Sequence, residues 1–127
     1  MLPLRYPIVW GLLGCGLLIV VAAGSLIPGN LTPETGLDDK VAHALSYFLL
    51  MIWFAGLYAR RRHALIALML LGFGAALELA QARLPYRFFD PRDLLANTAG
   101  IVLGLTLSFT LLAGWCQRVE RAMGYDD

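Results

Sequence analysis

The amino-acid sequence predicts an all-α protein, an integral membrane bundle of four transmembrane helices that forms a single domain over residues 1–127. The first observation is composition: 59% of the 127 residues are hydrophobic and only 15% are charged. The second is size, because a soluble domain this small buries only about 60–70% of its unfolded surface, so much of its apolar surface must face lipid or a large partner. The third is that the apolar residues gather into four stretches, each near the roughly 20 residues that a helix needs to cross a bilayer.

The first stretch, residues 7–27, also resembles a secretory signal. The basic residue Arg5 precedes it, and the small residues Ala22, Ala23 and Gly24 lie near its end. The apolar core of a signal peptide is typically about 7–15 residues long, which is shorter than this stretch. We therefore predict a retained membrane helix rather than a cleaved signal.

The other three stretches cover residues 41–58, 64–82 and 94–116. All four stretches lack an interior proline and are apolar on every side, which is typical of helices surrounded by lipid or by other helices. Asp93 directly precedes the last stretch, where its carboxylate is expected to cap the N-terminus of the helix. Within that stretch, Gly100 and Gly104 form a GxxxG pattern, which predicts close approach of a neighbouring helix.

Lysine and arginine in the connections predict the orientation in the membrane. Six of these residues fall on the side of the two termini: Arg5, Arg60, Arg61, Arg62, Arg118 and Arg121. Four fall on the opposite side: Lys40, Arg83, Arg87 and Arg92. The compact triple-arginine turn favours the cytoplasm for its side, so both termini are predicted to be cytoplasmic.

With this topology, three different helices carry a polar residue at the same depth. His43, Glu78 and Asn97 each lie about one helical turn, roughly 5.4 Å, below the outer surface. Asp39 and Tyr47 share the helix face of His43, because each is four residues away from it. An ionisable side chain within a membrane span is a functional candidate by default. A structural alternative is that His43 and Glu78 form a buried link that only fixes helix packing.

Other features of the sequence point away from several classes of function. The formal net charge is +1, and no basic stripe alternates with aromatic residues, so no nucleic-acid partner is expected. Cys15 and Cys116 lie in apolar runs without CxxC spacing and are interpreted as small apolar residues. The sequence contains no HExxH spacing, no GxSxG elbow and no phosphate-binding loop. We therefore assign no cofactor and no metal ligand.

The polar residues that converge at this outer end also carry a family resemblance. They occur in the order Asp39-Lys40-Val41-Ala42-His43, then Tyr47, Glu78 and Gln81, then Arg87-Phe88-Phe89-Asp90-Pro91-Arg92-Asp93, followed by Asn97, Gly100 and Gly104. In this order and spacing, from about residue 28 to residue 104, the sequence resembles the VanZ-like family of small bacterial integral membrane proteins. The founding member of that family is associated with low-level teicoplanin resistance. The resemblance implies a multi-pass protein of the bacterial cytoplasmic (inner) membrane that acts at its outer face in envelope or glycolipid chemistry, without supplying a reaction.

The first hypothesis for function is binding of a membrane lipid or a lipid-linked cell-wall precursor through its head group. Cationic side chains would contact phosphate, while acids and amides would contact hydroxyl or amide groups. The candidate ligand-binding residues are Lys40, Tyr47, Gln81, Arg87, Asp90, Arg92, Asp93 and Asn97.

The second hypothesis is a membrane-embedded enzyme that modifies such a lipid. His43 and Glu78 would act as general acid and base, and Asp39 would orient the imidazole. Residue types at this end also suit a divalent metal, although the spacing signal for one is weak. The third hypothesis is a structural partner of an envelope complex, in which the polar residues only hold the helices together. Glycines in the first helix leave a homo-oligomer possible.

Overall fold

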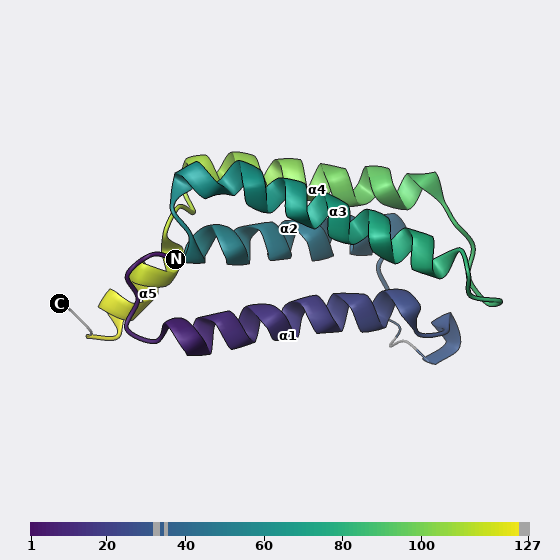
Figure 1. Cartoon of the computed structure of the whole chain (residues 1–127), viewed down its shortest axis with the longest axis horizontal. Helices are drawn as coiled ribbons and strands as arrows, with labels where there is room; N and C mark the ends of the chain where they lie inside the picture. The colour runs from purple at the N-terminus through teal and green to yellow at the C-terminus, as the bar shows by residue number, and fades with distance from the viewer. Residues whose placement is uncertain (32–33, 35, 125–127) are drawn as a thin grey trace.

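The computed structural model describes residues 1–31, 34 and 36–124, and this part of the chain is helical, without strands. Its order along the chain is α1 (Pro7–Leu26), the short 3₁₀ turn η1 (Gly29–Leu31), α2 (Asp39–Leu57), the 3₁₀ turn η2 (Arg60–Arg62), α3 (His63–Gln81), α4 (Pro91–Phe109) and α5 (Trp115–Ala122). The four long helices lie side by side, and α5 lies across one end of the bundle beside the N-terminus (Figure 1). The predicted all-α fold is confirmed.

The tightest packing in the molecule is between α2 and α4, which run in the same direction. A Cβ atom on Gly100 would collide with the Ala44 carbonyl oxygen, and one on Gly104 would lie 2.8 Å from Met51 Cβ. The two backbones can approach this closely only because both positions lack a side chain. The predicted role of the GxxxG pattern is therefore confirmed, and Asp93 and Asn97 lie buried on the same helix.

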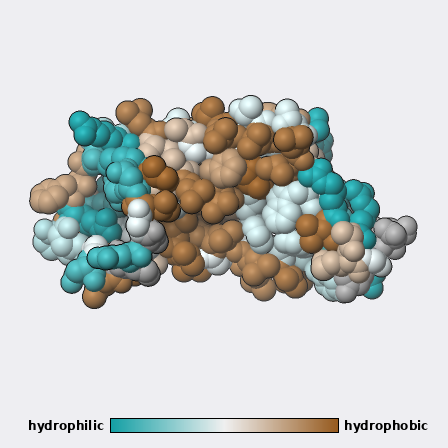
Figure 2. All heavy atoms as spheres, turned by 180° about the vertical axis from the view of Figure 1, so that it is seen from behind, coloured by the Kyte–Doolittle hydropathy of each residue, from teal (hydrophilic) through white to brown (hydrophobic). Residues whose placement is uncertain are grey.

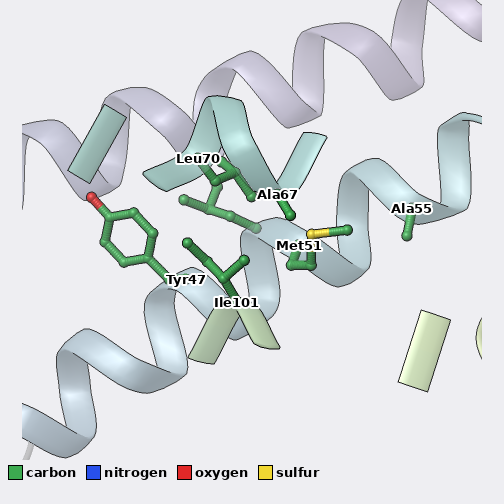
Figure 3. Packing of buried hydrophobic residues seen from close by; sticks show 7 residues of the cluster. Tyr47, Met51, Ala55, Ala67, Leu70 and Ile101 are labelled. Carbon is green, nitrogen blue, oxygen red and sulfur yellow. The ribbon is translucent and has the colours of Figure 1, made fainter. Parts of the chain in front are cut away.

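The apolar core lies where α2, α3 and α4 meet. Its buried members are Tyr47, Leu50, Met51, Ala55, Ala67, Leu70 and Ile101, most of which are labelled in Figure 3. By contrast, α1 buries only Gly14, which lies against the rings of Trp53 and Phe54. Hydrophobic residues form a broad band across the middle of the surface, with hydrophilic residues at both ends (Figure 2). This distribution is typical of a protein whose helices lie in a bilayer.

Three of the described helical segments are long and apolar enough to cross a membrane: Pro7–Leu26, Asp39–Leu57 and Arg60–Gln81. They match the predicted stretches 7–27, 41–58 and 64–82. The fourth predicted stretch, 94–116, is wrong as a single helix, because α4 ends at Phe109 and the separate helix α5 begins at Trp115. The chain turns at Gly114, whose φ of +60° is a conformation that favours glycine. The described structure therefore does not confirm a count of four spans, since α4 has the length of a span but begins with charged and polar residues.

Candidate functional site

A cluster of charged side chains lies at the end of the bundle where α2 and α4 begin, and we call it the polar cluster. Its centre is Lys40, whose Nζ contacts the carboxylates of Asp90 at 2.7 Å, Asp39 at 3.5 Å and Asp93 at a shorter distance. Lys40 and Asp39 come from the first turn of α2, and Asp90 and Asp93 come from the start of α4. The parallel packing of α2 and α4 brings these residues together, although about 50 residues separate them in sequence.

The acids of the polar cluster also stabilise the helix ends that carry them. Asp38 caps α2 by accepting a hydrogen bond from the Lys40 N–H, and Asp90 caps α4 by accepting one from the Arg92 N–H. The expectation that Asp93 is the cap is wrong, because α4 begins one turn earlier, at Pro91. The hydrogen bonds from the Lys40 ammonium and the Arg92 N–H hold the pKa of Asp90 below its ordinary value. Asp90 therefore stays ionised at neutral pH.

His43 extends the polar cluster into the bundle. Its Nδ1 lies 3.0 Å from Asn97 Oδ1 on α4, so this nitrogen donates and Nε2 is left with a lone pair in the neutral ring. Nε2 faces Asp93 Oδ2 at 3.7 Å and Asp39 Oδ1 at 3.9 Å. Both distances exceed those of a hydrogen bond. The three side chains Asp39, His43 and Asp93 each offer an atom within 4.8 Å of the others, which is a geometry that could hold a metal ion.

Glu78 and Tyr47 lie just below the polar cluster, in the interior. Glu78 is 2% exposed, and its carboxylate accepts a hydrogen bond from the Asp90 backbone N–H. Its other oxygen, Oε2, is buried without a hydrogen-bond partner among the described residues. Tyr47 is equally buried, and its hydroxyl and the Asn97 amide press against α3 at Gly74, where a Cβ would lie 3.1–3.2 Å from both. The α3 helix can pass this close because position 74 is glycine.

Two of the candidate ligand-binding residues contact α1 rather than the polar cluster. Gln81 donates from Nε2 to the Ser25 carbonyl at 2.6 Å, and Arg87 donates to the carbonyls of Gly24 and Ile27 at 3.2 and 2.6 Å. Together with Tyr86, which donates to the Leu26 carbonyl, these side chains satisfy four successive carbonyls at the C-terminus of α1. Arg92 differs from both, because its side chain is exposed and interacts with Asp90 only through charge.

Sequence reasoning missed a polar contact at the opposite end of the bundle. Glu120 on α5 accepts hydrogen bonds from the backbone N–H groups of Arg5 and Tyr6 and from Trp10 Nε1, at 2.8–3.1 Å. The first turn of a helix leaves its N–H groups unpaired, and a carboxylate near that end is stabilising. The amphipathic pattern of α5, with the buried Glu120 among exposed arginines, was the available signal, but it was hidden by the assignment of residues 94–116 to one helix.

His63, which begins α3, was also missed as a structural residue. It is fully buried, and its Nε2 lies 3.2 and 3.0 Å from the carbonyls of Ala55 and Tyr58. Its Nδ1 lies 3.0 Å from the Ser108 hydroxyl on α4. His63 therefore joins α2, α3 and α4 at the end that carries the termini. No local pattern in the sequence distinguishes it from a residue of the arginine turn.

An apolar crevice of about 350 Å³ opens between α1 and the pair α2 and α3. Its lining residues are Leu18, Phe54, Tyr58, Arg62, Leu65, Ile66, Met69, Leu70 and Phe73. The crevice exists because α1 is held by hydrogen bonds at its two ends and packs only sparsely along its length. Arg62 and Tyr58 place the only polar groups of this lining near the end that carries the termini.

Comparison with known proteins identifies the family. The chain is 34% identical over 96 residues to an uncharacterized protein from the yeast Schizosaccharomyces pombe, a match that covers 72% of this chain and 57% of that protein. No solved structure matches. Because this relative is from yeast, the predicted bacterial origin and location of the chain remain predictions. The family model described as VanZ/LLP1 matches residues 17–113, which include α2, α3, α4 and the polar cluster, and the chain therefore belongs to the VanZ/LLP1 family.

Proposed function

We propose that this protein is a four-span membrane protein that binds the polar head group of a membrane lipid, or of a lipid-linked envelope precursor, at the polar cluster. The observation that carries the proposal is the convergence of charged and hydrogen-bonding groups at one end of otherwise apolar helices. The cluster is open to water at its rim, since the Asp39 side chain is 68% exposed, and closed below, since the Asp93 side chain is 10% exposed. A head group at the membrane surface would meet this gradient from water to buried polar groups.

The parallel packing of α2 and α4 supports a fourth crossing. Both helices have 19 residues, which at about 1.5 Å per residue is roughly 28 Å, close to the hydrocarbon thickness of a bilayer. If α2 crosses, α4 traverses the same layer in the same direction. Asp93 and Asn97 near the start of α4 are buried, and its exposed residues include Leu95, Val102 and Leu103. Four crossings place both termini on the side of the triple-arginine turn, which we assign to the cytoplasm.

The charges indicate which head groups fit. Lys40 and Arg87 were candidates for phosphate contact, but the first is surrounded by carboxylates and the second is bound to carbonyls of α1. Arg92 is an exposed cation whose charge acts on Asp90 of the polar cluster. We propose that it contacts a phosphate, while the carboxylates accept hydrogen bonds from hydroxyl or amine groups of the same head group.

A second function is enzymatic modification of such a lipid, and the geometry of His43 favours it. Asn97 fixes one ring nitrogen, and the other faces two carboxylates without a hydrogen bond to either. A histidine held in this way has the arrangement of a general base, with Asp39 positioned beside it and Glu78 as a buried acid. A modified lipid that accumulates with the intact chain and not with His43→Gln would support this function.

The test of the proposed function is native mass spectrometry of the chain extracted gently from its own membrane. Wild type is compared with Arg92→Ala and with the control Arg83→Ala, which removes the same charge from an exposed position outside the cluster. We expect wild type and Arg83→Ala to carry the same defined lipid. The fraction of Arg92→Ala that carries this lipid should be at least tenfold lower. Equal occupancy of unselected lipids in all three forms would contradict a head-group site and favour a purely structural role for the polar cluster.

A further inference from the structure

We propose that Asp39, His43 and Asp93 bind a divalent transition metal, Zn²⁺ or Mn²⁺, at the polar cluster. This site lies beside the proposed head-group contacts. Its role rests on the proposed function, because a bound cation would link the carboxylates to an anionic head group. Binding of the metal itself requires no lipid. The two proposals can therefore fail separately.

Each of the two carboxylates divides its oxygens between two neighbours. One oxygen of each, Asp39 Oδ2 and Asp93 Oδ1, contacts Lys40 Nζ. The other oxygen of each, Asp39 Oδ1 and Asp93 Oδ2, faces His43 Nε2. Lys40 thus neutralises part of the charge of both carboxylates through the oxygens that do not face His43. Three atoms that can each bind a cation therefore lie within 4.8 Å of one another.

The two separations measured from His43 are slightly longer than those between the ligands of a bound metal ion. Ligand atoms about 2.0–2.2 Å from a tetrahedral zinc lie roughly 3.3–3.6 Å apart. The observed distances from His43 Nε2 are 3.7 Å and 3.9 Å. Asp39 has a largely exposed side chain, so a small rotation brings its oxygen to ligand distance without disturbing the core. Three protein ligands also leave a fourth position open, as in metal sites that bind a further molecule.

Asn97 supplies the outer contact that a metal-binding histidine requires. Such a histidine usually donates its other ring N–H to an oxygen, which fixes the tautomer and directs the free lone pair at the metal. The Nδ1 of His43 makes this contact with Asn97 Oδ1 at 3.0 Å. Asn97 is buried and held against Gly74 of α3, so the ring orientation is fixed by the packing of three helices. An exposed cluster of acids alone would not include a histidine whose ring is oriented in this way.

Glu78 supplies a second observation at this end of the bundle, a buried oxygen without a partner among the described residues. Its carboxyl group is almost fully buried, and Oε2 has no hydrogen-bond partner in the described part of the chain. The carboxyl groups of Asp39, Asp90, Asp93 and Glu78 share this end of the bundle with Lys40 and the exposed Arg92. A buried carboxylate without a compensating partner is costly, and a nearby divalent cation reduces that cost. One imidazole nitrogen with two carboxylate oxygens suits Zn²⁺ or Mn²⁺.

The test is a Zn²⁺ titration of the purified, chelator-treated chain in lipid-free detergent, measured by competition with a fluorescent chelator. Wild type is compared with His43→Gln and Asp39→Asn. The matched control is Asp38→Asn, which removes the same charge one residue away while asparagine keeps the capping role. We expect one Zn²⁺ per chain for wild type and the control. His43→Gln and Asp39→Asn should each weaken affinity at least tenfold.

Equal affinity for wild type and His43→Gln, or no stoichiometric binding by wild type, would overturn the proposal. Circular dichroism of each variant without metal establishes that the chain is folded, and the exposed Asp39→Asn carries the test if His43→Gln does not fold. Native mass spectrometry of the same samples with added lipid separates the two proposals. Zinc bound without retained lipid contradicts only the head-group site, and lipid retained without zinc contradicts only the metal site.

Discussion

The two histidines, at opposite ends of the same bundle, show how different one residue type can be. Each ring nitrogen of His63 has a partner supplied by the chain, from the carbonyls of α2 and from Ser108. His43 has one partnered nitrogen, and the other faces two carboxylates at distances beyond a hydrogen bond. A fully satisfied, fully buried histidine contributes to architecture. A half-satisfied histidine beside acids leaves a position that a proton, a metal ion or a ligand can fill.

The hydrogen bonds that hold α1 also differ between the two ends of the molecule. At the terminal end, a single carboxylate, Glu120, accepts three hydrogen bonds around the start of α1. At the other end, Gln81, Tyr86 and Arg87 donate to the last carbonyls of the helix. These contacts hold a helix that buries almost nothing else, and they leave the crevice beside it. Polar residues near a membrane surface can therefore fasten a helix as readily as they bind a ligand.

The largest expected loss of stability is from a change at Gly100, which lies at the contact between α2 and α4. Gly100→Ala would place a Cβ against the backbone of Ala44, which a small side-chain movement cannot relieve. Overpacking a core costs about 1–3 kcal/mol, and a clash with backbone exceeds that range. We expect loss of monodisperse, folded protein on size-exclusion chromatography in detergent.

The matched control for this change is Gly72→Ala, on α3, where nothing lies within 4 Å of an added Cβ. Alanine is a better helix former than glycine by about 0.8–1.0 kcal/mol, so this variant should be as stable as wild type or more stable. If Gly100→Ala were as stable as Gly72→Ala, the close contact of α2 and α4 described above would be contradicted.

The next effect compares the two histidines directly. His63→Ala removes the hydrogen bonds of the ring to the Ala55 and Tyr58 carbonyls, which costs about 1–3 kcal/mol in addition to the cavity that it creates. His43→Ala removes a single hydrogen bond, to Asn97, from a side chain that is 14% exposed, so we expect it to destabilise the fold less than His63→Ala. Thermal unfolding in detergent measures both. Equal destabilisation by the two changes would mean that His43 is also purely architectural.

The sequence predicts much of this arrangement, because membrane helices follow composition and length. Hydropathy predicts the first three apolar helices. Helical spacing predicts that Gly100 and Gly104 face inward and that His43 approaches Asn97. The end of α4 was missed because residues 94–116 contain no charged residue and no proline, while the turn lies at Gly114. The partners of Arg87 were missed because they are backbone carbonyls of α1, which carry no sequence signal.

The smallest effect is a pH dependence at Glu120. Burial alone would raise the pKa of its carboxyl, but hydrogen bonds from the N–H groups of Arg5, Trp10 and Tyr6 lower it below the ordinary value of about 4.3. A carboxyl whose pKa is lower in the folded state stabilises the fold above its unfolded pKa, and this stabilisation is lost as the pH falls through the folded pKa.

Glu120→Gln should therefore melt a few degrees below wild type at pH 7, and the two melting curves should converge below about pH 4. Asp90 has a lowered pKa too, but it is present in both proteins, so the difference between them isolates Glu120. A gap that persists unchanged to pH 3 would show that Glu120 acts through shape rather than charge. Convergence would show that the charge of one carboxylate on α5 holds the start of α1 in place. The end of the bundle that carries the termini would then be structural, in contrast to the polar cluster, where Nε2 of His43 has no hydrogen-bond partner in the part of the chain that the structure describes.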